Sequence, residues 1–348
     1  MTNHLESLLR PHLQTLKPYT SARDEYTGSA HVWLDANENP FSSAVNRYPD
    51  PYQRELKERV ASLKGIAPER IFLGNGSDEA IDLLIRLFCR PGQDGIMVCP
   101  PTYGMYAVSA HIHEAAVTEI LLDDDFQPDP KAILHAARPG HDKLLFLCSP
   151  NNPTGNSIEE ARLRKLLESF PGIVVLDEAY IDFADTPSRL DWLAEYPHLV
   201  VMHTFSKAWG MAGLRLGMAA ADPRIIGWLS KIKAPYNLNQ LTLNYAEQQL
   251  SDTTAFTENL AMLKKERRRV LDVLHTMHEL EAVYPSEGNF VLIEVSDPDG
   301  LYEALLARGI VVRNRSQQPK LTGCLRLTIG TPRENDDLLD ALRSHLPA

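Results

Sequence analysis

Short apolar runs alternate with helical patterns between about residues 50 and 220, and this alternation limits the fold more than any other feature. The runs are almost wholly apolar and lie at residues 71–73, 95–99, 144–148, 173–176 and 199–203. Strands buried on both faces have this composition, because helices cover both sides of a parallel sheet. Helices are expected at residues 54–64, 77–89 and 157–170, the last opening with Ser157 and Glu160 in capping-box spacing. The pattern predicts an α/β fold with a large, mostly parallel sheet flanked by helices.

A smaller α/β unit is expected towards the C-terminus. Residues 239–277 are periodic in apolar side chains and read as helix. Strand and helix patterns then alternate at residues 289–295, 301–308, 310–313, 324–329 and 334–345. A chain of 348 residues is long enough for two domains. We expect an N-terminal arm at residues 1–40, a large domain at 41–240, and a linking helix with a small domain at 241–348.

Charge and composition exclude several classes of partner. The formal charge of −11 and the pI near 5.6 disfavour binding to nucleic acid or to an anionic membrane, which requires a basic face. No run approaches the ~20 apolar residues of a spanning helix, and the N-terminus lacks a signal-peptide layout, so we expect a cytoplasmic protein. The four cysteines lie far apart, and no cysteine or carboxylate completes a four-ligand pattern with the histidines. Neither disulfides nor a metal site are therefore expected.

Residues 204–217 place a lysine between hydroxyl groups and an arginine, in a glycine-rich turn after an apolar run. A lysine becomes a covalent catalyst when desolvation or a neighbouring cation removes its proton, and Lys207 fits that description. Ser206 and Arg215 supply a hydroxyl and a guanidinium for a phosphate. Pyridoxal 5'-phosphate carries both an aldehyde and a phosphate. Taken alone, Lys207 reads more readily as a solvated surface lysine, and the other motifs of the chain favour the catalytic reading.

Other polar side chains follow predicted strands, where ligands gather in parallel α/β sheets. The loop at residues 74–79 joins a strand to a helix and suits a phosphate, or is simply a tight turn. Asn152 lies in a proline-fixed loop, which on its own is only a turn signal. Asp177 ends an apolar run and needs a cationic partner such as a protonated pyridine nitrogen, unless it caps a helix. Tyr103 is a candidate for stacking on a ring, or for ordinary packing.

The order and spacing of these motifs resemble those of the fold-type-I pyridoxal-phosphate aminotransferases, and the resemblance extends over nearly the whole chain. Within that group the chain is most similar to the histidinol-phosphate aminotransferases, through residues 17–19, 34–40, 47–49, 100–106 and 323–330. The resemblance implies that Lys207 binds the cofactor as a Schiff base and that Asp177 pairs with its pyridine nitrogen. It implies further contacts with the cofactor ring by Tyr103, Asn152 and Tyr180. Around the cofactor, chiefly at its phosphate, it places Ser77, Asp78, Thr204, Ser206 and Arg215.

The resemblance also implies a homodimer with shared active sites, in which Tyr48 reaches the phosphate of the partner subunit's cofactor. Arg326 matches the arginine that binds the substrate carboxylate in ordinary aminotransferases, and Arg313 matches a second arginine for a substrate phosphate. Further substrate-binding candidates are Tyr19, Asn37 and Tyr236.

The implied reaction is transamination between histidinol phosphate and 2-oxoglutarate, giving imidazole-acetol phosphate and glutamate, in histidine biosynthesis. Alternatives are a lyase resembling threonine-phosphate decarboxylase, an aminotransferase for aromatic or other amino acids, and a non-catalytic binding domain.

Overall fold

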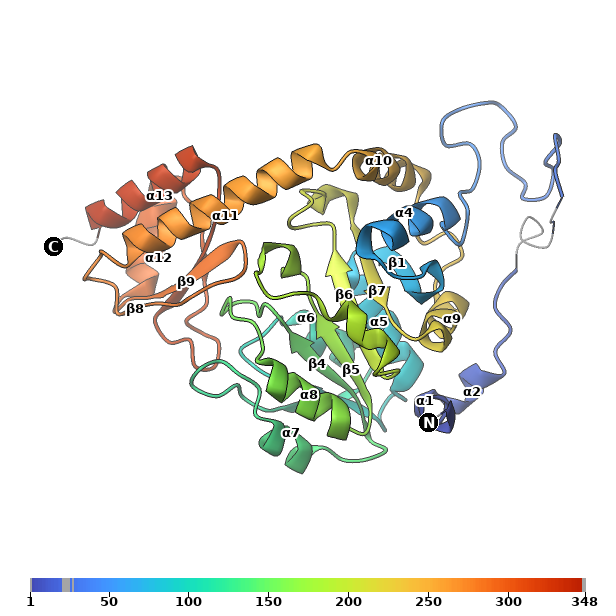
Figure 1. Ribbon diagram of the computed structural model, residues 1–348, viewed down its shortest axis with the longest axis horizontal. Helices are drawn as coiled ribbons and strands as arrows, with labels where there is room; N and C mark the ends of the chain where they lie inside the picture. Colours follow the sequence, from blue (N-terminus) through green and yellow to red (C-terminus); the bar gives the residue numbers. More distant parts are fainter. Residues whose placement is uncertain (1, 21–25, 27, 346–348) are drawn as a thin grey trace.

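A seven-stranded sheet with the order β1-β7-β6-β5-β4-β2-β3 forms the centre of the larger part of the molecule (Figure 1). The computed structural model describes residues 2–20, 26 and 28–345. The strands are β1 (Ile71–Asn75), β2 (Gly95–Val98), β3 (Ala116–Glu119), β4 (Asp142–Cys148), β5 (Ile173–Asp177), β6 (Leu199–Thr204) and β7 (Leu216–Ala220). Strands β3, β2, β4, β5 and β6 pair in parallel, whereas β7 runs antiparallel between β6 and β1. The prediction of a mostly parallel sheet is confirmed.

Helices cover both faces of this sheet. They are α1 (Thr2–Leu8), α2 (Pro11–Gln14), α4 (Arg54–Lys64), α5 (Ser77–Phe88), α6 (Met105–Ile112), α7 (Pro130–Ala136), α8 (Glu160–Ser169) and α9 (Pro223–Ile232). Alternation along β5 shows why the strands are so apolar: Val174 and Leu176 join one core cluster with α4, α7 and α8. Ile173 and Val175 join a second cluster with α1, α5, α6 and α9. Each strand residue thus packs against one of two helical layers.

The smaller part of the molecule is built on a four-stranded antiparallel sheet with the order β10-β11-β9-β8. Its strands are β8 (Ala282–Val283), β9 (Phe290–Glu294), β10 (Arg313–Asn314) and β11 (Cys324–Thr328). Helices α12 (Pro298–Ala307) and α13 (Pro332–His345) pack with α11 (Thr254–Leu274) around one apolar cluster. Figure 1 shows α10 (Gln240–Ser251) and α11 passing from one sheet to the other. The residue limits proposed for the domains stay a prediction.

Three predicted helices are divided or begin three residues away from the expected position. Helix α12 begins at Pro298, three residues earlier than expected. The stretch at residues 239–277 is divided into α10 and α11, because Asp252 is extended and its carboxylate accepts the N–H of Thr254 at 2.9 Å. Helix α8 begins at Glu160, three residues later than expected. The Ser157 hydroxyl donates to the Glu287 carboxylate instead of capping this helix.

Two smaller differences concern strands. The strand expected at residues 310–313 is reduced to Arg313–Asn314, and β3, β7 and β8 lie outside the predicted strands. In the described part of the chain, no helix is long and apolar enough to cross a membrane.

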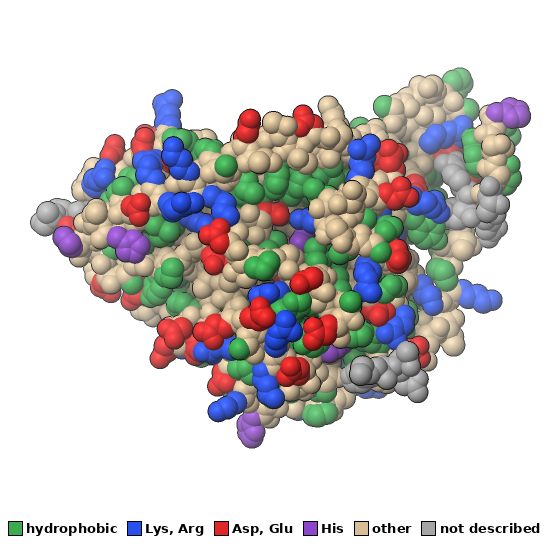
Figure 2. Space-filling view, viewed as in Figure 1, with side chains coloured by type: hydrophobic (Ala, Val, Ile, Leu, Met, Phe, Trp, Pro, Cys, Tyr) green, Lys and Arg blue, Asp and Glu red, His purple; other side chains and the backbone are tan. Residues whose placement is uncertain are grey.

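Residues 28–50 project away from both sheets, at the upper right of Figure 1. Several of their apolar side chains are open to solvent, led by Leu34 at 86% exposure and Phe41 at 82%. Figure 2 shows green side chains on this projection. The segment is held locally, since the Glu38 carboxylate accepts from Arg47 NH1 at 2.7 Å and from the Tyr48 N–H at 2.6 Å. We refer to residues 28–50 as the arm.

Candidate active site

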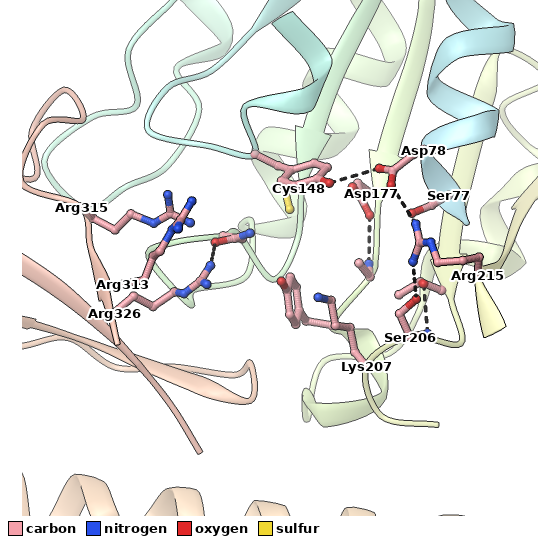
Figure 3. Close-up of a pocket in the computed structure, with 15 residues that line it drawn as sticks. Ser77, Asp78, Cys148, Asp177, Ser206, Lys207, Arg215, Arg313, Arg315 and Arg326 are labelled. Carbon is pink, nitrogen blue, oxygen red and sulfur yellow. Dashed lines mark hydrogen bonds and ion pairs between the residues drawn. The ribbon is translucent and has the colours of Figure 1, made fainter. Parts of the chain in front are cut away.

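A cavity of about 460 Å³ lies between the carboxyl ends of β4, β5 and β6 and the small sheet (Figure 3). It brings together most of the predicted site residues, namely Ser77, Asp78, Tyr103, Asn152, Asp177, Tyr180, Thr204, Ser206, Lys207, Arg215, Arg313 and Arg326. Three further residues line it, Cys148, Ala179 and Arg315. The parallel strands explain this convergence, because their carboxyl ends meet at one edge of the sheet.

Lys207 projects into the cavity from the turn that follows β6. Its Nζ lies 5.7 Å from the centre of the Tyr180 ring. The side chain is open to the cavity, but the surrounding walls desolvate the amine and lower its pKa, and the nearby Arg326 guanidinium lowers it further. A lysine that loses its proton more readily is a better nucleophile and base.

Asp177 ends β5 with only 3% of its surface exposed. The Tyr106 hydroxyl donates to one carboxylate oxygen at 2.6 Å, and the Ala179 N–H donates to the other at 3.0 Å. Burial raises the pKa of Asp177 to about 6, although both hydrogen bonds act in the opposite direction. None of the described lysines or arginines forms an ion pair with this carboxylate. A buried carboxyl in this setting gains most from a cationic ligand.

Tyr106 has no role in the sequence-based prediction. It lies on α6, is fully buried, and stacks on Phe146 with 4.8 Å between ring centres. Its position three residues after Tyr103 was visible in the sequence, but its partner Asp177 is 71 residues away in the chain. Only the folded structure reveals that contact.

One end of the cavity is built for an anion. Helix α5 begins at Ser77 after Gly76, which has a φ of 75° and gives the helix no side-chain cap. The first N–H groups of such a helix lack intrahelical partners and attract phosphate. Arg215 adds a guanidinium, whose Nη2 lies 3.1 Å from Asp78 Oδ2 and whose Nη1 lies 3.4 Å from Ser206 Oγ. Asp78 also accepts from the Tyr103 hydroxyl at 3.1 Å.

Close packing of two backbone segments holds Arg215 at this helix end. The Gly76 N–H donates to the Arg215 carbonyl at 2.7 Å. A side chain at Gly217 would place its Cβ 2.2 Å from the Ser77 nitrogen, which is closer than atoms can approach. Only glycine therefore permits β7 to lie against the start of α5.

The other end of the cavity is lined by arginines from the small sheet. Arg313 on β10 and Arg326 on β11 are directly paired in the antiparallel register. Arg326 donates to the Asn152 side-chain oxygen and so contacts the loop after β4. Figure 3 shows Arg313, Arg315 and Arg326 on the side of the cavity opposite Arg215, with Lys207 between the two groups.

The sequence-based prediction omitted Arg315, Cys148 and Ala179. A signal for Arg315 was present, because residues two apart in an extended segment share one face and Arg313 was already a candidate. Cys148 closes β4, and Ala179 enters the site through its backbone N–H. No side-chain chemistry marks either position in the sequence.

Four predicted residues lie outside this cavity. Tyr48, at the end of the arm, stacks on Tyr236 with 4.5 Å between ring centres and 14° between planes. Tyr19 is 69% exposed, and Asn37 is an exposed arm residue with a φ of 54°. Within the described chain none of the four lines the cavity, and their proposed contacts stay predictions.

Known proteins are similar to this chain in both sequence and fold. The sequence pattern of the family described as aminotransferase class I and II matches residues 22–342. Histidinol-phosphate aminotransferase of Parabacteroides distasonis is 51% identical over 98% of this chain and 98% of its own length. The enzyme of that name from Cytophaga hutchinsonii is 47% identical over 99% of this chain and 100% of its own.

Two solved structures extend the comparison. Histidinol-phosphate aminotransferase of Clostridium acetobutylicum is 25% identical, with a TM-score of 0.79 over 89% of this chain and 97% of its own. The fold also matches the Sinorhizobium meliloti enzyme, solved with pyridoxal 5'-phosphate, at 22% identity and a TM-score of 0.79 over 97% and 96% of the two chains. The chain therefore belongs to the class I and II aminotransferases, and within them to the histidinol-phosphate aminotransferase family.

Proposed function

We propose that this protein transfers the amino group of histidinol phosphate to 2-oxoglutarate, with pyridoxal 5'-phosphate as its cofactor. The relatives that carry the histidinol-phosphate aminotransferase name cover almost the whole chain at 47–51% identity. The observation that carries the proposal is the position of Lys207 between two separate anion-binding ends of one cavity. A phosphorylated cofactor and a phosphorylated substrate each need one of these ends.

The residues present fit pyridoxal 5'-phosphate. The start of α5, Ser206 and Arg215 would hold its phosphate. Gly76 leaves room for the Arg215 guanidinium, and Gly217 lets β7 pack against the start of α5. Asp177, buried and without an ion-pair partner in the described chain, would face the pyridine nitrogen. Tyr103, Asn152, Tyr180 and Thr204 line the space between these groups.

Bound pyridoxal 5'-phosphate supplies an aldehyde for the amine and an electron sink for the substrate carbon. Lys207 would hold the aldehyde until a substrate amine replaces it, and its Nζ would then move the proton from the substrate carbon. Its lowered pKa favours the neutral amine that both tasks require. Asp177 would keep the ring nitrogen protonated, and Tyr106 orients Asp177 through the 2.6 Å hydrogen bond.

Arg313 and Arg326 would bind the phosphate of histidinol phosphate, and Arg326 would bind a carboxylate of glutamate or 2-oxoglutarate. Both guanidinium groups face the cavity without a carboxylate partner in the described part of the chain. A guanidinium matches both anions, because its planar fork donates two parallel hydrogen bonds.

We infer that two chains pair through the arm and that Tyr48 enters the partner subunit's site. The exposed Leu34 and Phe41 support this assembly, since apolar surface of this kind favours burial against another chain. Tyr19 and Asn37 belong to the same N-terminal region and are candidates for the shared site.

A direct test incubates the cofactor-loaded protein with histidinol phosphate and 2-oxoglutarate and measures glutamate by chromatography. Lys207→Ala should abolish turnover, whereas Lys231→Ala, on the outer helix α9, should leave it unchanged. Glutamate formation that survives Lys207→Ala would contradict the mechanism. Carbon dioxide release from phosphothreonine, with no glutamate from histidinol phosphate, would contradict the proposed substrate.

A further inference from the structure

Arg315 lies in the cavity beside Arg313 and Arg326, although neither the sequence motifs nor the family resemblance gave it a role. Its backbone N–H donates to the Cys324 carbonyl at 2.9 Å, which continues the pairing of β10 with β11 beyond Arg313 and Arg326. Residues two apart in an extended segment point to the same side. The three guanidinium groups therefore form one cluster, which we call the arginine cluster (Figure 3).

The arginine cluster has no compensating carboxylate. Among the described residues, no aspartate or glutamate forms an ion pair with Arg313, Arg315 or Arg326. Asp299 and Glu303 line the adjoining surface with Arg313 and Arg315. The Asp299 carboxylate accepts a hydrogen bond from the Asn314 amide at 2.7 Å, and Glu303 forms no ion pair among the described residues. Other arginines of the chain do pair, for example Arg90 with Asp94 at 2.8 Å. The cluster is thus an excess of positive charge inside a cavity.

Within the described chain, Arg326 has a covered, unpaired Nε, but it donates through another nitrogen to Asn152. Arg315 has no such side-chain hydrogen bond among the described residues and is unfavourably placed in the absence of an anion. It is half-buried, and its Nε is covered without a hydrogen-bond partner in the described structure. Burial, followed by the charges of Arg326 and Arg313, lowers its pKa to about 10. A buried donor without an acceptor and a buried charge without a counterion are both unfavourable. A bound anion with several oxygens would relieve both.

The number of guanidinium groups distinguishes between anions. A carboxylate has one charge and two oxygens, and one bidentate arginine can satisfy it. A phosphate monoester has a charge of about −1.5 to −2 at pH 7 and three terminal oxygens. Resting on the proposed function, we propose that Arg315 determines specificity: it binds the substrate phosphate as a third guanidinium and favours the phosphorylated amine over the carboxylates of glutamate and 2-oxoglutarate.

Steady-state kinetics test this role with phosphorylated and unphosphorylated substrates. Arg315→Gln should lower kcat/KM for histidinol phosphate about 10- to 100-fold more than for histidinol, as expected for hydrogen bonds to a charged group. The KM for glutamate should change much less. The loss of kcat/KM in Arg315→Lys should lie between that of Arg315→Gln and the unchanged wild type, because lysine keeps the charge and lacks the planar fork. Arg333→Gln, an exposed arginine on α13, removes the same charge and should leave both substrates unaffected.

An equal loss for histidinol phosphate and histidinol would overturn the proposal, because it would indicate a general structural defect. No loss for either substrate would also overturn it. Circular dichroism melting of each variant identifies any that fail to fold. If Arg315→Gln fails to fold, the milder Arg315→Lys provides the comparison between histidinol phosphate and histidinol.

A binding measurement separates this inference from the proposed reaction. Calorimetry of the cofactor-loaded protein compares butyl phosphate with pentanoate. Arg315→Gln should weaken the binding of butyl phosphate about tenfold or more and leave the affinity for pentanoate nearly unchanged. In the wild type, butyl phosphate affinity should rise as the pH passes about 6, where the monoester gains its second charge, and Arg315→Gln should reduce that rise.

If the wild type fails to convert histidinol phosphate while these binding differences hold, the proposed substrate is wrong and the phosphate-selective role of Arg315 stands. If the binding differences are absent while turnover is normal, the role of Arg315 is wrong and the proposed reaction stands.

Discussion

Asp177 gives the site a pH dependence whose direction follows from its burial. Its pKa is raised to about 6, so the carboxyl is neutral below that pH and charged above it. Only the charged form attracts a protonated pyridine nitrogen. The affinity of the cofactor-free protein for pyridoxal 5'-phosphate should therefore fall as the pH decreases through about 6. Fluorescence titration between pH 5 and 8 measures this affinity. An affinity that does not change over this range would show that Asp177 does not face the ring nitrogen.

Tyr106 should affect the pH at which the cofactor affinity falls. Its hydroxyl donates to Asp177 and lowers the pKa of that carboxyl, in opposition to burial. Tyr106→Phe removes the hydrogen bond, so the pKa of Asp177 should rise and the drop in cofactor affinity should move to higher pH. Tyr302→Phe on α12, outside the cavity, is the matched control. If Tyr106→Phe weakens cofactor binding equally at every pH, the hydroxyl acts only through packing.

At the scale of single residues, the sequence located those at or just after the end of a strand. Asp177 was identifiable because a carboxylate that ends an apolar run needs a cationic partner. Lys207 was identifiable because Ser206 and Arg215 accompany it in one motif. Tyr106 and Arg315 were not, since their significance depends on partners from distant segments. Contacts between segments leave no mark in the local pattern of the sequence.

The contact between β7 and α5 controls the phosphate end of the site. Gly217→Ala would drive a Cβ into the Ser77 nitrogen and separate the two backbones. We expect a loss of about 1–3 kcal/mol in the free energy of unfolding, typical of overpacking, together with weaker cofactor binding. Denaturant unfolding and fluorescence titration provide the two measurements.

Gly227 in the interior of α9 is the matched control, because a Cβ there meets nothing within 4 Å. Gly227→Ala should leave cofactor binding intact and stabilise the helix by up to about 1 kcal/mol. Equal behaviour of the two variants would contradict the steric argument.

Most of the central strands and helices were predictable, whereas β3, β7 and several ends and interruptions were not. The range expected for α4 coincides with Arg54–Lys64, where Gly65 in the left-handed region ends the helix. The break between α10 and α11 depends on a single aspartate side chain that accepts a backbone N–H. The start of α8 depends on Glu287, which lies 130 residues from Ser157 and draws its hydroxyl away. Periodicity does not report either interaction.

The arm is the part of the molecule best suited to join two chains. Phe41→Asp places a charge on an apolar side chain with 82% exposure. If the arm packs against a partner, this substitution should raise the dimer dissociation constant about tenfold or more, because a buried unpaired charge is costly. Sedimentation equilibrium over a concentration series measures the constant.

Val311→Asp is the control, since Val311 has 77% exposure and belongs to the small unit. It should leave the dimer constant unchanged. A wild type that remains monomeric at every concentration, or two variants that weaken the dimer equally, would contradict pairing through the arm.

The two anion-binding ends of the cavity belong to different sheets, with Arg215 on one side and Arg326 on the other. The cofactor held at one end and the substrate held against it at the other would together link the two parts of the molecule. Their combined length would then set the distance between the sheets, and a substrate analogue one carbon longer would increase it. Occupancy should consequently slow amide hydrogen exchange in β10 and β11 as well as at the start of α5, even though neither strand shares backbone pairing with α5.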